Sequence, residues 1–238
     1  MAYTPMYSDR GKSIIAFPLN YCVLDLETTG LSSEWDEIIE IGAIKFENGQ
    51  EVDRFQTLVK PRPYSDGTFV LPFITELTGI TNEILKDAPK IGSILPSLLN
   101  FLGELPIIGY NTSFDVNFIY ANCSRCMDRP FTTDFVDTMR LARKLHPELE
   151  HHRLQDMVEL FGIAHEGAHR TISDCEATHE CYLRLKDEAL SRYETAENFA
   201  LQFKKKYGYC VKSADIQGDE SKINEDSPIY QGSVTTNG

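Results

Sequence analysis

The N-terminal part of the chain carries short apolar runs separated by polar turns, which is the pattern of strands in a sheet. A short strand is predicted around residues 13–17, and residues 20–27 form a mostly apolar run typical of a central strand buried on both faces. A second strand follows at 37–47, and Asn48-Gly49 predicts a tight hairpin turn because a type I′ turn needs positive φ at both central positions. A third strand at 52–59 completes a meander of consecutive strands.

Farther along the chain the apolar spacing becomes that of helices alternating with short strands. The predicted helices cover residues 93–102, a segment starting near 113, and residues 138–144, 154–161 and 173–190, and the predicted strands lie at 106–110 and near 135. Pro96 is compatible with the first helix because it falls near the first turn, and Gly162 ends the helix at 154–161. A meander followed by alternating helices and strands predicts an α/β domain with a mixed central sheet flanked by helices.

The polarity of the chain divides it into four predicted segments. We expect a short N-terminal leader at 1–19, a main domain at 20–190, a helical extension at 191–212 and a flexible tail or linker at 213–238. The last segment is rich in Asp, Ser, Gly and Asn and has few apolar residues, so it cannot bury enough surface to fold alone.

Composition and charge narrow the class of protein. The 238 residues are 42% hydrophobic and 25% charged, which is typical of a soluble globular protein, and no apolar run approaches the roughly 20 residues of a membrane span. Residues 1–10 lack the layout of a secretory signal, so we expect a cytoplasmic protein. The formal charge of −13 repels phosphate and argues against tight, sequence-independent binding along duplex DNA. Any contact with nucleic acid is therefore expected to be local and assisted by bound cations.

The cysteines fit a reducing compartment. The chain has six of them, scattered through a sequence too long to need disulfide bonds for its stability. Cys123 and Cys126 form a C-x-x-C pair, which is compatible with a zinc or redox site. No second pair at metal-binding spacing accompanies it, and the pair lies inside a predicted helix. We therefore expect buried free thiols.

A pair of acids ends the first long strand. Asp25 and Glu27 lie two residues apart, so in a strand their side chains point to the same face. Two anionic groups at the end of a buried strand are unfavourable unless a positive group lies between them, and divalent cations with oxygen ligands meet that need. The pair alone is also compatible with an ordinary turn at a strand end.

Two further acids stand at predicted helix starts. Asp115 lies in a first turn whose N-cap is predicted to be Ser113, with its charge facing the positive end of the helix dipole. Asp174 opens a later helix, where residues 173–176 match a capping box, and His169 lies in the loop just before it. Each of these residues alone has an ordinary explanation as a capping or surface residue, so the inference depends on their combination.

Taken together, these residues resemble a known family of nucleases. The Asp25–Gly30 motif (D-L-E-T-T-G), Asp115, and a histidine five residues before a helical aspartate follow the order of the DEDDh (DnaQ-like) 3′→5′ exonucleases. The best-known member of this family is the proofreading epsilon subunit of bacterial DNA polymerase III. The resemblance covers roughly residues 19–185 and includes the motifs at 77–81 and 137–138. It implies a ribonuclease H-like fold and makes 20–190 an exonuclease domain.

The resemblance also implies a set of site residues. Two divalent cations, Mg²⁺ or Mn²⁺, are expected to be held by four acids, and a histidine is expected to serve as the general base because imidazole titrates near neutral pH. The acids are Asp25, Glu27, Asp115 and Asp174, the base is His169, and the neighbours of the terminal nucleotide are Thr28, Thr29, Asn111 and Phe114. Tyr110 departs from the family pattern, since many relatives carry a histidine before the asparagine. Asp137 is left out of the catalytic set because it can cap its own helix.

The implied activity is removal of nucleoside 5′-monophosphates from the 3′ end of single-stranded or frayed DNA, in proofreading or in repair. DNA is favoured over RNA as the nucleic-acid partner, and a DNA polymerase is a possible protein partner. Trimming of RNA 3′ ends is the alternative within the enzyme class, and a non-catalytic module that keeps only the fold is the alternative outside it. The intact set of four acids and one histidine argues against that module.

Two surface features are left open. A basic set could guide the strand backbone or could simply be a solvated helix face; it consists of Arg140, Arg143, Lys144, His151, His152 and Arg153, and Lys204–Lys206 have the same two explanations. The segment at 226–232 resembles the lead-in to a BRCT domain found in some longer relatives. A further C-terminal domain is therefore one interpretation of the tail, and a disordered end is the other.

Overall fold

The computed structural model describes the backbone of residues 9–207 and the side chains of residues 9–203, and its centre is one mixed sheet. The strands run in the order β1-β6-β5-β2-β3-β4 across the sheet. Their bounds are β1 Ser13–Ile14, β2 Tyr21–Thr28, β3 Ile38–Glu47, β4 Gln50–Leu58, β5 Ile107–Gly109 and β6 Phe135–Asp137. β2 therefore lies inside the sheet, between β5 and β3, and its last residues lie at the C-terminal end of an interior strand.

The predicted meander is confirmed. β2 pairs antiparallel with β3, and β3 pairs antiparallel with β4. Asn48 and Gly49 have φ values of 51° and 75°, as the predicted hairpin turn requires. β4 begins at Gln50, earlier than the predicted residue 52, because the tight turn lets pairing resume at once.

The other half of the sheet is parallel. β5 pairs with β2, β6 pairs with β5, and the short β1 pairs with β6. β1 comes from the predicted leader and covers only Ser13–Ile14 of the segment expected at 13–17. Because parallel strands need covered faces, helices must lie on both sides of the sheet.

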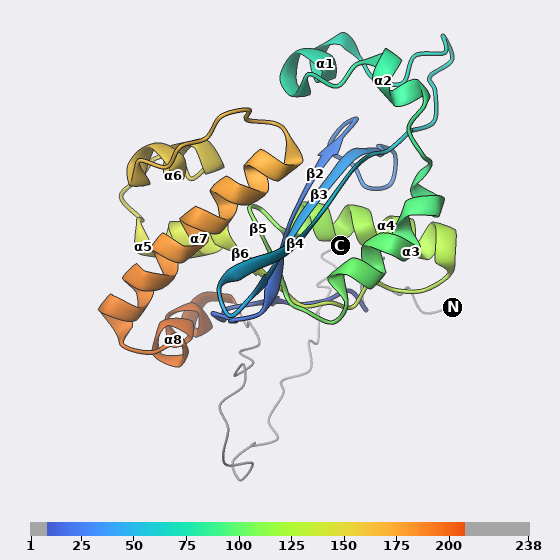
Figure 1. Ribbon diagram of the computed structural model, residues 1–238. Coiled ribbons are helices and arrows are strands. Elements are labelled where there is room, and N and C mark those ends of the chain that lie inside the picture. The colour runs from blue at the N-terminus through green and yellow to red at the C-terminus, as the bar shows by residue number, and fades with distance from the viewer. Residues whose placement is uncertain (1–8, 208–238) are drawn as a thin grey trace, which may run out of the picture.

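Helices cover both faces, as Figure 1 shows. The α5–α8 group lies on one side, with α7 across β2 and β3, and α3 and α4 lie on the other. The bounds are α1 Pro72–Thr78, α2 Asn82–Lys86, α3 Ile91–Leu102, α4 Ser113–Met127, α5 Thr138–Leu145, α6 Leu154–Phe161, α7 Thr171–Tyr193 and α8 Ala196–Tyr207. Each face of the sheet has its own apolar core. This arrangement is the predicted α/β fold with a mixed sheet flanked by helices.

Two short helices were not predicted. α1 and α2 lie beyond the sheet at the end where β2 finishes, and they form a small separate core against Ile39 of β3 (Figure 1). That core also contains Val70, Ile74, Ile80 and Leu85. The motif at 77–81 ends α1 at the left-handed Gly79 and begins α2 at its N-cap Thr81. Segments this short carry too little apolar periodicity to be recognised from the sequence.

The predicted N-caps of α7 and α4 need correction. α7 begins at Thr171, before the predicted Ser173, and its N-cap is Arg170. The predicted capping box is wrong, because the Ser173 hydroxyl donates to the carbonyl of Glu166 (2.6 Å) and Glu176 pairs with an arginine of β4. At α4 the N-cap is Thr112 instead of Ser113, and the Thr112 hydroxyl donates to the carbonyl of Val136 (3.0 Å). At α7, tertiary contacts therefore recruit the two side chains that local propensity assigned to capping.

The cysteines follow the expectation with one exception. Cys22, Cys123, Cys175 and Cys181 are buried free thiols, whereas Cys126 is exposed near the end of α4. Within residues 9–203, the single cluster of possible metal ligands contains no cysteine. Among the described helices, none has the length and apolarity needed to cross a membrane. Cys210 and the predicted tail at 213–238 lie outside the described residues, and α8 occupies much of the predicted extension at 191–212.

Candidate active site

The end of β2 presents the first two acids of the site. Asp25 and Glu27 lie opposite Gly42 and Glu40 of β3, and the ladder becomes irregular just after Glu27. The sequence places apolar residues on either side of Asp25, so β2 enters the core and delivers its carboxylates at the point where the core ends. Both side chains are partly buried, as the alternation along a central strand predicts.

Two helices bring the other acids to the same place. Asp115 lies in the first turn of α4 and Asp174 in the first turn of α7, and both are buried. A hydrogen bond from the backbone of Leu26 to Asp115 ties α4 directly to β2. The structure therefore brings Asp25, Glu27, Asp115 and Asp174 together from opposite faces of the sheet, and their function as metal ligands stays a prediction.

Burial and the neighbouring acids raise the pKa values of the four carboxyl groups. Burial raises the pKa of Asp25 well above its usual range, and the charges of Asp115, Asp174 and Glu27 raise it further. Burial raises the pKa of Glu27 to about 8, with Asp174 and Glu40 adding to the effect and Arg170 opposing it. Burial likewise raises the pKa of Asp115 and of Asp174. A set of buried acids that resist ionisation is stabilised when cations bind among them.

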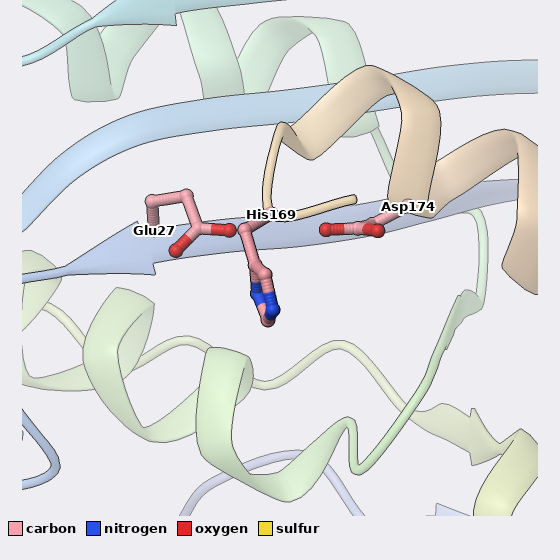
Figure 2. Close-up of side chains that lie close together, drawn as sticks. All are labelled: Glu27, His169 and Asp174. Atoms are coloured by element: carbon pink, nitrogen blue, oxygen red, sulfur yellow. The ribbon is translucent and has the colours of Figure 1, made fainter. Parts of the chain in front are cut away.

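His169 completes the cluster. One ligating atom each from Glu27, His169 and Asp174 lies within 4.8 Å of the others, and Figure 2 shows the His169 ring between the two carboxylates. The three side chains come from the end of β2, the loop before α7 and the first turn of α7. His169 is exposed and has φ of 63°, a left-handed conformation that is uncommon for a residue other than glycine. The carboxylate oxygens of this cluster are the ligands that suit a hard divalent cation.

A second histidine reaches the site and was not predicted. His165 Nε2 lies 2.7 Å from an oxygen of Asp174, and its side chain is only 5% exposed. Its other ring nitrogen, Nδ1, is buried and has no hydrogen-bond partner among the described residues. In the sequence, His165 lies in a polar loop nine residues before Asp174, and this spacing matches no motif that would predict a contact between them. The contact becomes visible only from the conformation of the loop in the structure.

The predicted neighbours of the terminal nucleotide surround the acids. The Thr28 hydroxyl donates to the carbonyl of Gly30 (2.7 Å), and the Thr29 hydroxyl accepts from the backbone N–H of Glu37 (2.9 Å). Both hydroxyls therefore hold the turn after β2, and any contact of Thr28 or Thr29 with a substrate is expected to use other atoms. Their function as substrate contacts stays a prediction.

The start of α4 carries the other two predicted neighbours. Asn111 has φ of 61° and donates its N–H to Asp137 (3.0 Å), which also accepts from Met139 and so acts as the predicted cap of α5. Phe114 is half-buried, with its ring 4.9 Å from that of Phe118. Contact between substrate and Asn111 or Phe114 also stays a prediction.

Several members of the basic set bond the protein itself. Arg140 contacts Ser13 and lies over the Phe203 ring, and Lys144 donates to the carbonyl of Gln202 (3.1 Å). Arg153 pairs with Asp156 at the start of α6 (2.9 Å). Tyr110, the departure from the family pattern, donates its hydroxyl to the carbonyl of His152 (2.8 Å) and fixes the loop before α6. These contacts favour a structural function for much of the basic set.

Comparisons with known proteins agree with this geometry. The family model described as "Exonuclease" matches residues 22–182. The chain is 36% identical over 179 residues to a PolC-type DNA polymerase III of Caldanaerobacter subterraneus, covering 75% of this chain but only 12% of that relative. It is 32% identical over 182 residues to the DNA polymerase III subunit epsilon of Aquifex aeolicus, covering 76% of this chain and 88% of the relative.

A solved structure supports the same fold. The nuclease domain of 3′hExo, a DEDDh family member bound to rAMP, superposes with a TM-score of 0.60 at 21% identity, covering 71% of this chain and 92% of that one. Fold and acid cluster together define an exonuclease domain of the ribonuclease H-like class. The chain belongs to the DEDDh (DnaQ-like) family of 3′→5′ exonucleases, and it is similar to the epsilon subunit of DNA polymerase III. Membership of this family implies dependence on divalent metal ions.

Proposed function

We propose that this protein removes nucleoside 5′-monophosphates one at a time from the 3′ end of single-stranded or frayed DNA. The observation that carries the proposal is the cluster of four buried or partly buried acids, drawn from β2, α4 and α7, with His169 against two of them. A cluster of this kind costs folding free energy in the absence of cations, and a binding function for the fold alone would not require it.

The four acids supply the ligands of the proposed reaction. Asp25, Glu27, Asp115 and Asp174 would hold two divalent cations, which supply activation of the attacking water and stabilisation of the leaving 3′ oxygen. The acids position those ions because three separate elements fix their side chains. Their raised pKa values favour a site that loads with cations as the carboxylic protons leave.

His169 is the proposed general base. Its imidazole accepts the proton of the attacking water at a ring nitrogen, and its exposure allows that proton to leave to solvent. A ligating atom of Glu27 and one of Asp174 lie within 4.8 Å of a ring nitrogen of His169, which places the proposed base beside the proposed cation site. Thr28, Thr29, Asn111 and Phe114 are proposed to surround the terminal nucleotide, with Phe114 offering a ring for stacking.

The physiological substrate is proposed from the relatives. Both relatives named above are DNA polymerase III proteins, which favours DNA and a cytoplasmic function in proofreading or repair. Trimming of RNA 3′ ends is the second candidate activity, because the nuclease domain of 3′hExo was solved bound to rAMP, a ribonucleotide. A DNA polymerase is the proposed protein partner.

A gel assay tests the proposal directly. Single-stranded DNA and RNA of the same sequence, labelled at the 5′ end, are incubated with the protein in Mg²⁺ or Mn²⁺, and parallel samples contain chelator or an Asp174→Asn variant. We expect a ladder of shortened strands that requires metal and is lost in the variant, and faster shortening of DNA than of RNA. Circular dichroism of the variant shows that it is folded. Intact strands under every condition would contradict the proposed activity.

A further inference from the structure

A buried acid on β3, Glu40, lies outside the proposed set of metal ligands. Glu40 lies opposite Glu27 in the β2–β3 ladder, and its side chain is 1% exposed. Both of its oxygens are occupied: Arg170 donates from Nε (3.1 Å) and Nη2 (2.8 Å), the backbone of Thr171 donates at 3.2 Å, and Gln56 donates at 3.1 Å. These bonds pair both oxygens of the buried carboxylate within the protein.

The partners of Glu40 have a specific place in the chain. Arg170 follows His169 directly and is the N-cap of α7, and Thr171 is the first residue of that helix. The two parallel bonds of a guanidinium to one carboxylate fix both distance and orientation. Glu40 therefore attaches the backbone just after His169 to the sheet that carries Asp25 and Glu27.

The conformation of His169 needs such an attachment. A left-handed φ in a non-glycine residue is strained and persists only where surrounding contacts determine it. Three bonds from Arg170 and Thr171 to Glu40 hold the C-terminal side of that residue, and the Ser173–Glu166 hydrogen bond holds the loop before it. His169 itself is exposed, so packing on its ring cannot supply the restraint.

We propose that Glu40 and Arg170 are positioning residues that hold the His169 backbone in its left-handed conformation and so place the imidazole between Glu27 and Asp174. The proposal rests on the proposed function, in which His169 is the base. Neither residue is expected to touch substrate or cations.

A second arginine pair offers a matched control. Arg54 of β4 also reaches from the sheet to α7, where it bonds Glu176 (2.6 Å). Both partners are exposed, and Glu176 lies on the far side of Asp174 from His169. Arg54→Ala therefore removes an ion pair between sheet and α7 without affecting the residue that precedes the helix.

The kinetic test compares Glu40→Gln, Arg170→Ala, Arg170→Lys and Arg54→Ala on single-stranded DNA at saturating Mg²⁺. Because misplacement of a catalytic group by about 1 Å can cost on the order of 100-fold, we expect kcat to fall about 10- to 100-fold in the first three variants. KM is expected to stay within about twofold, since substrate contacts are intact. Arg54→Ala is expected to keep the kcat of the unchanged protein.

Two further measurements separate positioning from general destabilisation. Methylguanidinium is expected to restore part of the kcat of Arg170→Ala, because the half-exposed side chain leaves a space open to solvent beside Glu40. The double variant Glu40→Gln/Arg170→Ala is expected to be no worse than the poorer single variant, since the two residues act as a unit. Rescue with normal melting temperatures supports the proposal, and equal losses in Arg54→Ala overturn it.

Hydrogen exchange tests the attachment without using activity. In Arg170→Ala, peptides covering residues 166–172 are expected to exchange faster, while peptides from β2 and β3 keep their protection. Unchanged exchange in that segment overturns the proposal even if the variants are slow. If the unchanged protein degrades no strand at all, the proposed function fails, whereas the exchange experiment still decides whether Glu40 and Arg170 hold the loop.

Discussion

Single side chains decide how the acid cluster is held, and His165 shows this most directly. Its Nε2 lies 2.7 Å from Asp174, and Asp174 is also within reach of His169. Metal-binding carboxylates are commonly oriented by a hydrogen bond from a neighbouring residue, and loss of that partner weakens metal binding. His165 is positioned to orient Asp174 in this way, while His169 remains free for proton transfer.

We predict that His165→Ala weakens metal binding more than it slows the reaction. The concentration of Mn²⁺ that gives half-maximal activity is expected to rise about tenfold, because the Asp174 carboxylate loses the group that orients it. A titration of activity against Mn²⁺ measures the effect. His165→Gln keeps an N–H donor and should recover part of the affinity. Equal metal dependence of the unchanged and Ala proteins would argue against an orienting function for His165.

At the scale of secondary structure, the approach of α7 to the sheet sets the geometry of the site. Gly42 lies opposite Asp25 on β3, and a Cβ added there would lie 2.5 Å from the side chain of Thr171. The Cys175 thiol also donates to the carbonyl of Gly42 (3.5 Å). The first turn of α7 therefore lies directly against β3, which brings Asp174 within reach of the β2 acids.

We predict that Gly42→Ala displaces the start of α7. The added methyl group overlaps Thr171, so the free energy of unfolding is expected to fall by about 1–3 kcal/mol, with a larger proportional loss of activity. Urea unfolding and the gel assay measure the two effects. Gly92→Ala is the control: its Cβ would meet only the Cys126 sulfur at 3.9 Å within α3, so stability should be unchanged or higher. Equal stability of Gly42→Ala and the unchanged protein would contradict this account.

The sequence predicted most elements because their apolar periods are regular. The β2–β4 meander and the helices α4 to α7 follow directly from such periods and from the Asn48-Gly49 turn. The four acids and His169 were located by motif and order, and the structure brings them together. Glu40, Arg170 and His165 were missed because their function depends on contacts between segments far apart in the chain. The N-caps assigned to Ser113 and Ser173 were wrong, although α4 does begin at Ser113.

For the whole molecule, the acid cluster links stability to pH and to metal. Burial raises the pKa of Glu27 from 4.5 in the unfolded chain to about 8, so the folded state binds this proton more tightly. The stability from this protonation is fully present below the unfolded pKa and is lost as the pH rises through the folded pKa. The raised pKa values of Asp25, Asp115 and Asp174 act in the same direction.

We predict that the melting temperature in chelator falls as the pH is raised from about 6 to about 8.5, through the folded pKa of Glu27. Mg²⁺ or Mn²⁺ should raise the melting temperature more at the higher pH, because the ionised acids bind the cations and the protonated acids do not. Thermal unfolding at several pH values measures both effects. Glu27→Gln should flatten the dependence on pH. A melting temperature that rises over this range would contradict the raised pKa of Glu27.

The placement of the four acids also has a consequence for synthesis of the protein. Asp25 and Glu27 are made early, Asp115 belongs to α4, and Asp174 lies in α7, close to the end of the described fold. A growing chain leaves the ribosome from its N-terminus, so the last ligand emerges only after the sheet strands have been made. A nascent or shortened chain that lacks α7 therefore lacks Asp174 and has no complete acid cluster. With Asp174 as the last of the proposed ligands, nuclease activity is expected only when nearly the whole domain has been made.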